Sequence, residues 1–296
     1  MRKILLTVIC AAAAVLLNAD VVMVLKMQRD CCMLYEPVIA ELTMRNTTGQ
    51  VLVFGSEAEF KGSLEVELTD MHDRPLPGSG AKIALKGLIL RPGIDQRIRI
   101  NLSKWVNLNK HGYYKLKLFI AHPMLKNEFE SNPVNFDISY GTVYWSRTFG
   151  VPQLTDNQSS AEDRTYTIRA MQDKSEIFLF LFVEDSRKIY TIKRLGIILG
   201  REKPACELDS LNQLHILRPI TPKIYQYQVY DWDGTREVNR IYRRTDRTPI
   251  LYRDPSNGNV KVIGGEIARS GVDYTEEKLL PGVPVNEDIP VAAPKK

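Results

Sequence analysis

Two aspartates flank a tryptophan and precede a glycine in the stretch VYDWDGT, residues 229–235. Carboxylates at this spacing could contribute to a calcium loop. Such a loop needs six or more oxygen ligands, and only Asp231 and Asp233 are supplied locally. Asp-Gly between two alternating segments is a strong hairpin signal, because glycine tolerates a positive φ. The stretch therefore predicts a tight turn, and we expect neither a metal nor a cofactor.

Aromatic and cationic side chains gather around this turn. Aromatic faces stack on sugars and arginines pair with carboxylates, so an exposed patch of this kind would suit a polysaccharide or an envelope protein. We favour a different interpretation, in which the tyrosines face a core and the basic run at 243–247 guards a strand edge against pairing. The candidate binding residues are Tyr230, Trp232, Arg240, Tyr242, Arg243, Arg244 and Arg247.

Signatures of catalysis are scarce in this sequence. Its four histidines stand apart, with none at metal-ligand spacing from another. It has no glycine-rich phosphate loop and no Gly-x-Ser-x-Gly elbow. Two carboxylates that only the fold brings together would leave no such trace, as in glycosidases. We expect a protein that is not an enzyme.

The N-terminus has the layout of an export signal. Arg2 and Lys3 precede an apolar run from Ile4 to Leu17, and Leu17-Asn18-Ala19 provides a cleavage site. We expect residues 1–19 to be a signal peptide and the protein to be secreted or periplasmic. The alternative is an uncleaved anchor, because apolar residues resume at 21–25, and a membrane contact is expected only in that case. Removing Arg2 and Lys3 lowers the net charge of +5 by two, too little positive charge to indicate a nucleic-acid partner.

Three cysteines follow the signal: Cys31, Cys32 and Cys206. An odd number in an oxidising compartment leaves at least one thiol without a partner in the chain. Adjacent cysteines on an extended chain point to opposite faces, so a disulfide would join Cys206 to either Cys31 or Cys32. The alternative, which we favour, is three buried thiols that pack as small apolar side chains.

The chain over residues 20–141 alternates with a period of two. Apolar residues recur at every second position within 38–44, 64–68 and 98–102, which predicts half-buried antiparallel strands. Turn-forming residues separate them at 46–50 and 74–80. These features predict an all-β domain.

The stretch HGYYKLKLFIAH, residues 111–122, resembles the penultimate strand of immunoglobulin-like β-sandwiches. A tyrosine near the start of that strand bonds back to the backbone and forms the tyrosine corner, a position that Tyr114 would occupy here. The segment at 131–139 would then be the closing strand. The resemblance implies an immunoglobulin-like sandwich over 20–141 and implies no function.

The second half repeats itself after an expected linker at 142–165. Residues 179–195 align with 225–241 at an offset of 46, which divides a domain at 166–267 into copies at about 175–219 and 220–267. A period in the mid-forties with about four strands per unit is similar to a β-propeller blade. Two copies cannot close a propeller, so we expect a two-copy antiparallel β-meander, followed by a flexible tail at 268–296.

These features favour an exported, non-enzymatic structural or protein-interaction module of the cell envelope. The alternative function is a carbohydrate-binding module that uses the aromatic and arginine residues of the second copy. The expected partner is accordingly an envelope protein or a polysaccharide.

Overall fold

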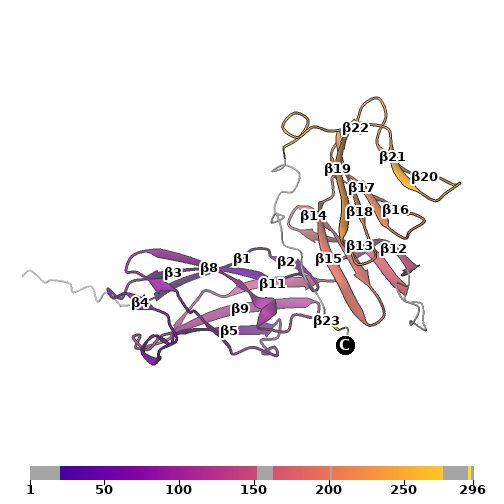
Figure 1. Ribbon diagram of the computed structural model, residues 1–296. Coiled ribbons are helices and arrows are strands. Elements are labelled where there is room, and N and C mark those ends of the chain that lie inside the picture. Colours follow the sequence, from indigo (N-terminus) through magenta and orange to yellow (C-terminus); the bar gives the residue numbers. More distant parts are fainter. Residues whose placement is uncertain (1–20, 152–162, 201, 276–292, 295–296) are drawn as a thin grey trace, which may run out of the picture.

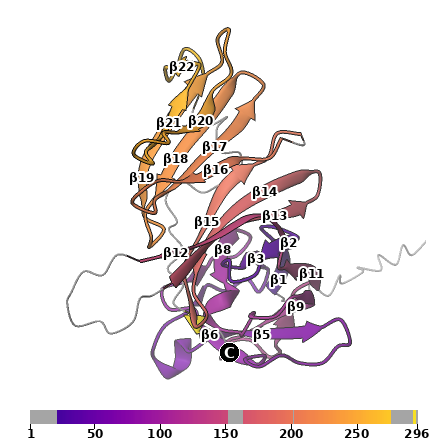
Figure 2. The same cartoon turned by 90° about the vertical axis from the view of Figure 1, so that its right-hand side faces the viewer.

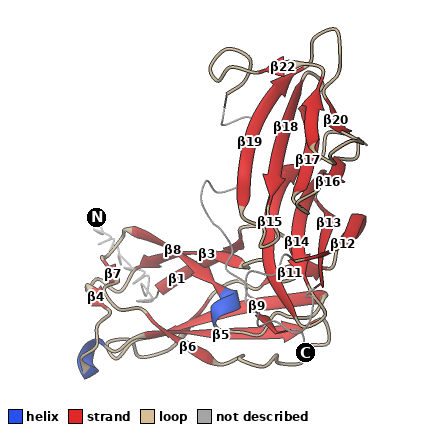
Figure 3. Cartoon of the chain, turned by 45° about the vertical axis from the view of Figure 1, so that its right-hand side comes forward, coloured by secondary structure: helices blue, strands red, loops and turns tan. Residues whose placement is uncertain are grey.

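The computed structural model describes residues 21–151, 163–200, 202–275 and 293–294. The chain in these ranges is built from β-strands, with two single-turn 3-10 helices at Ala58–Phe60 and Leu102–Lys104 (Figure 3). The predicted all-β class is therefore confirmed. No helix among the described residues is long and apolar enough to cross a membrane. The expected signal peptide lies outside the described residues.

Two sheets form the N-terminal half. The first has the strand order β1-β3-β8 and the second has the order β2-β11-β9-β5-β6, with β10 paired to β9 and a separate β4–β7 ladder. The strands are β1 (Val21–Met27), β2 (Cys31–Met33), β3 (Ile39–Asn46), β4 (Leu52–Val53), β5 (Ser63–Asp70), β6 (Ala81–Ala84), β7 (Ile89–Leu90), β8 (Asp95–Asn101), β9 (Gly112–Ala121), β10 (Phe129–Glu130) and β11 (Val134–Ser139).

One apolar core lies between these two sheets, since alternate residues of each strand are buried. Leu42 of β3, Val66 of β5 and Leu118 of β9 are fully buried members of this core. The bond expected at Tyr114 is present, because its hydroxyl donates to the backbone oxygen of Lys110 at 2.7 Å. This contact ties the start of β9 to the loop before it.

Two further sheets form the C-terminal half. The first sheet has the order β12-β13-β14-β15-β23 and the second has the order β16-β17-β18-β19-β22, while β20 and β21 form a separate hairpin. The strands are β12 (Thr142–Gly150), β13 (Asp163–Asp173), β14 (Glu176–Glu184), β15 (Lys188–Ile197), β16 (Ala205–Leu208), β17 (Leu214–Thr221), β18 (Ile224–Tyr230), β19 (Arg236–Arg243), β20 (Ile250–Arg253), β21 (Val260–Ile263), β22 (Glu266–Ile267) and β23 (Ala293–Pro294).

The β12–β15 sheet is covered on both faces and lies in the middle of the molecule (Figure 2). On one face, Tyr166, Leu179 and Leu181 share a core with Ile216 of the second sheet. On the other face, the aromatic side chains of β14 pack against Met33 of the N-terminal half. Strand β14 is therefore apolar at successive positions, as expected of a strand buried on both faces.

The prediction of a linker at 142–165 is wrong where the structure describes this segment, because strands occupy both of its ends. Residues 142–150 form β12, and β13 begins at 163. Strand β12 is the edge of its sheet and exposes much of its surface, so polar and aromatic residues are mixed along it without alternation. The hydroxyl of Thr148 pairs there with that of Thr165 at 2.9 Å. Residues 152–162 lie outside the described part.

The two sequence copies match strand for strand, but they do not form blades. Strands β14–β17 align with β18–β21, yet the expected boundary at 219/220 falls inside β17, which pairs with β18. The short turn at 222–223 makes β17 and β18 a hairpin, so one sheet contains strands of both copies. The propeller-like arrangement is thus corrected to two sheets that cross the copy boundary.

The tail expected to be flexible contains ordered contacts. Ala268 is buried, and its backbone N–H donates to the oxygen of Ile241 at 2.9 Å. Further on, Ala293–Pro294 forms β23 and pairs with Lys188 and Ile189 of β15. Residues 276–292 and 295–296 lie outside the described part.

Candidate functional site

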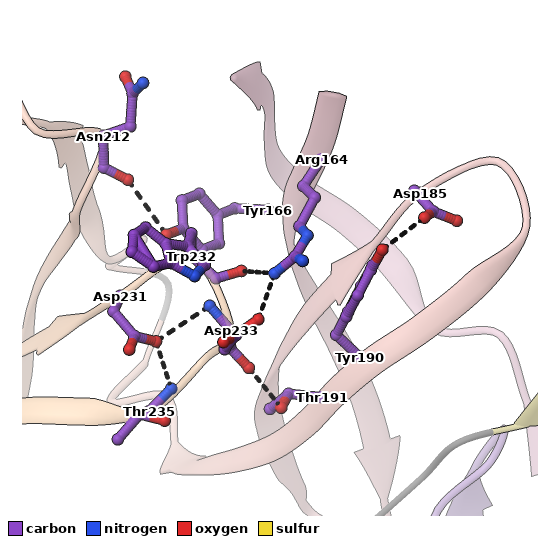
Figure 4. Close-up of polar contacts among 10 residues, drawn as sticks. All are labelled: Arg164, Tyr166, Asp185, Tyr190, Thr191, Asn212, Asp231, Trp232, Asp233 and Thr235. Atoms are coloured by element: carbon purple, nitrogen blue, oxygen red, sulfur yellow. Dashed lines mark hydrogen bonds and ion pairs between the residues drawn. The ribbon is translucent and has the colours of Figure 1, made fainter. Parts of the chain in front are cut away.

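The stretch at 231–235 forms the turn that its sequence predicts, between β18 and β19. The Asp231 carboxylate accepts the backbone N–H groups of Asp233, at 3.0 Å, and of Thr235, at 2.7 Å (Figure 4). Gly234 has a φ of +81°, which a glycine adopts without strain. Within the described ranges, no three His, Cys, Asp or Glu side chains are grouped to hold a metal ion. The two aspartates serve the turn.

This turn is attached to the first C-terminal sheet through Arg164 of β13. Arg164 Nη1 donates to the backbone oxygen of Trp232 at 3.0 Å and pairs with the Asp233 carboxylate. Its guanidinium also lies 3.7 Å from the centre of the Tyr190 ring. Thr191 Oγ1 donates to the backbone oxygen of Asp233 at 2.7 Å. The turn is therefore a bridge between the two sheets.

The aromatic platform that the alternative function requires is not assembled on the surface. Tyr230 is 2% exposed in the core between the sheets, and Trp232 is half-buried against that core. Tyr242 lies on the opposite face of the second sheet, half-buried, with its ring edge-on to Tyr227 at 6.2 Å. Arg240 is exposed on β19 and faces Tyr227 across the strand pair. These aromatic rings hold sheets together, so they offer no continuous surface for stacking sugars.

Two of the predicted arginines, Arg243 and Arg244, do line a cavity. It has a volume of about 520 Å³ and lies where the β17–β18 turn meets the end of β19. The Arg244 backbone N–H donates to the Lys223 oxygen at 2.7 Å and holds these two segments together. Arg247 is exposed in the loop that follows. The residues that line this distal cavity are Thr221, Pro222, Lys223, Ile224, Arg243, Arg244 and Asp273.

Positive charge dominates the distal cavity. Lys223, Arg243 and Arg244 contribute three cations against the single carboxylate of Asp273. Arg243 also pairs with Glu266 at 2.5 Å, but both side chains are about half exposed, so water screens this pair. The cavity keeps a net positive charge and can accept an anionic group.

The possible disulfide between Cys206 and Cys31 or Cys32 is not formed, and all three are free thiols in the described part of the chain, as in the interpretation that we favoured. Cys31 packs on the Met33 side of the β12–β15 sheet, whereas Cys206 packs on its other face. The sheet itself separates them. Burial raises the pKa of Cys32 and of Cys206 to about 12, so these thiols stay protonated and pack as apolar side chains.

A second cavity was not predicted from the sequence. It has a volume of about 220 Å³ and is lined by Arg147, Thr148, Phe149, Leu208, Asp209, Asn212 and Arg253. These residues come from three separate parts of the chain, so no local spacing announces them. No protein-family model matches this sequence, and the curated proteins contain no match to it. Function must therefore be inferred from the geometry of the two cavities.

Proposed function

We propose that this chain is an exported, non-enzymatic interaction module of the cell envelope that binds an acidic segment of a partner protein at the distal cavity. One observation carries the proposal: Lys223, Arg243 and Arg244 surround a single cavity of about 520 Å³. Arginine forks pair with carboxylates through two parallel hydrogen bonds, and Ile224 and Pro222 add apolar surface for neighbouring side chains.

The position of the distal cavity supports the same proposal. The β17–β18 turn and the end of β19, whose residues line it, lie at the end of the second sheet, away from the N-terminal half (Figure 1). A partner could reach it without displacing any part of the described fold. The alternative function, carbohydrate binding through Tyr230 and Trp232, has weaker support because both rings are engaged in packing.

The test is crosslinking of the tagged full-length protein in cells, followed by affinity purification and mass spectrometry. The variant R243E/R244E should recover about tenfold less of a recurrent protein partner, since the reversed charges repel an acidic segment. The matched control, R240E/R247E, reverses two exposed arginines that do not line the cavity and should retain the partner. Equal loss in both variants would contradict the proposed site, and recovery of polysaccharide without a protein partner would contradict the proposed protein partner.

A further inference from the structure

The second cavity lies where three elements meet. The end of β12 provides Arg147, Thr148 and Phe149, the turn between β16 and β17 provides Asp209 and Asn212, and the β20–β21 hairpin provides Arg253. The β16–β17 turn is joined to the end of β12 beside the cavity, because Asn212 Nδ2 donates to the backbone oxygen of Gly150 at 3.0 Å. This arrangement surrounds a small volume with side chains of both charges, and the distal cavity shares none of them.

Asp209 is nearly buried, at 9% exposure, and three hydrogen bonds hold its carboxylate in place. One oxygen accepts the backbone N–H groups of Leu211, at 2.9 Å, and of Gln213, at 2.8 Å. The other lies 3.2 Å from His215 Nε2. A carboxylate has about four acceptor positions, so one position remains for a ligand.

His215 fixes the direction of this network. Its Nδ1 lies 2.7 Å from the Tyr227 hydroxyl, and burial lowers the pKa of His215 although Asp209 opposes that shift. A neutral ring carries one proton, and the carboxylate can only accept, so we assign the proton to Nε2. Nε2–H then donates to Asp209, and the Tyr227 hydroxyl donates to Nδ1. The carboxylate is thereby oriented by a neutral partner.

The rest of the cavity lining is cationic at the rim and apolar inside. Arg147 and Arg253 are exposed at its rim, where guanidinium groups can pair with a carboxylate of a ligand. Phe149 and Leu208 are nearly buried, at 5% and 8% exposure, and only their edges line the cavity, since the Phe149 ring is stacked on Tyr166 at 4.2 Å. A ligand for this cavity therefore needs a carboxylate, a hydrogen-bond donor and an apolar face.

We propose that this cavity binds an acidic sugar residue, with its carboxylate at Arg147 and Arg253 and one hydroxyl donating to Asp209. C–H groups of the sugar ring would contact the edges of Phe149 and Leu208 that line the cavity. A sugar hydroxyl has one hydrogen to donate, which matches the one remaining acceptor position of Asp209. An ammonium group has three, so two of its donors would lack an acceptor on Asp209, and a hydroxyl fits this position better. This site is separate from the distal cavity and does not depend on the protein partner proposed above.

The test is titration of the purified chain with glucuronate, followed by ligand-observed NMR, with glucose and glycine as comparisons. A ligand of this size should bind with a Kd of about 1 mM. Glucose lacks the carboxylate and should bind at least tenfold more weakly. Absence of saturable glucuronate binding would overturn the proposal, as would equal binding of glucose or a preference for glycine.

Two variants distinguish the predicted contacts. Arg253→Gln changes an exposed side chain and should weaken glucuronate binding about tenfold, with little effect on glucose, while Arg240→Gln is the matched control and should change neither. Asp209→Asn should weaken both sugars, and its melting curve checks that the turn survives. Retention of glucuronate affinity in Arg253→Gln would overturn the proposal. Arg253→Gln should leave the crosslinked protein partner intact, so failures of the two proposals are distinguishable.

Discussion

His215 illustrates how a single buried residue couples stability to pH. Its pKa in the folded protein is below the ordinary value of 6.5, chiefly because burial disfavours the charged ring. As pH falls through 6.5, the unfolded chain binds a proton at this position while the folded protein does not. The free energy of unfolding should therefore be unaffected by His215 above this range and should decrease on acidification, by at most about 1.4 kcal/mol per pH unit.

The measurement is urea unfolding at pH 7.5, 6.5 and 5.5. The decrease between 6.5 and 5.5 should be smaller in His215→Gln than in the natural chain, because the variant lacks the titrating ring. His72→Gln provides the control, because it replaces a histidine that is exposed in the folded protein. An unchanged slope in His215→Gln would show that His215 binds protons equally in the folded and unfolded states.

At the scale of elements, the turn at 231–235 determines how the two C-terminal sheets meet. Gly234 has a positive φ, and a Cβ atom there would lie 2.7 Å from the side chain of Thr191 on β15. Gly49 also has a positive φ, +77°, but a Cβ atom there would meet nothing within 4 Å. Gly49→Ala should cost about 1 kcal/mol of stability from backbone strain alone. Gly234→Ala should cost about 1–3 kcal/mol more, because it also adds a clash.

Chemical denaturation of the two glycine variants checks this comparison. Equal decreases in the free energy of unfolding would mean that a side chain at residue 234 does not clash with Thr191 of β15. Thr191→Ala removes the Cγ2 and Oγ1 contacts together with the Oγ1 hydrogen bond to Asp233, while its Cβ stays. Gly234→Ala should therefore cost less stability in the Thr191→Ala background than in the natural chain. An equal cost in both backgrounds would attribute the loss to the backbone conformation of residue 234.

The same elements show what the sequence can and cannot reveal. Strand alternation and the Asp-Gly turn are local, so β3, β5, β9 and the turn at 231–235 were predictable. Strand β12 was missed because an edge strand lacks the apolar alternation of a half-buried one. The pairing of β17 with β18 depends on which hairpins join a sheet, which the 46-residue period does not specify. For the same reason, Arg147, Asp209 and Arg253 could not be connected before the fold brought them together.

At the scale of the whole molecule, one junction sets the arrangement of the two halves, which form an L (Figure 3). Met33 is fully buried against Phe178, Phe180 and Phe182 of β14, which belong to the other half. Beside them, the buried Glu36 carboxylate pairs with Arg29, and Arg194 of β15 lies 4.0 Å away. Burial lowers the pKa of Arg194 to about 10, although Glu36 opposes that shift. Breaking such a buried charge cluster is costly, so the halves should move as one body.

A shared core of this kind predicts that the two halves unfold in a single transition. Met33→Asp places a charge among the phenyl rings and should separate the melting curve into two transitions, because burying an unpaired carboxylate costs several kcal/mol. The N-terminal transition should remain, since the Met33 side chain belongs to the junction cluster and not to the N-terminal core. Small-angle X-ray scattering should show a larger radius of gyration as the angle between the halves becomes variable. Met71→Asp is the matched control, because Met71 is 67% exposed in the same half and should change neither measurement. If Met33→Asp shifted one intact transition without expanding the molecule, the junction would not be what couples the two halves.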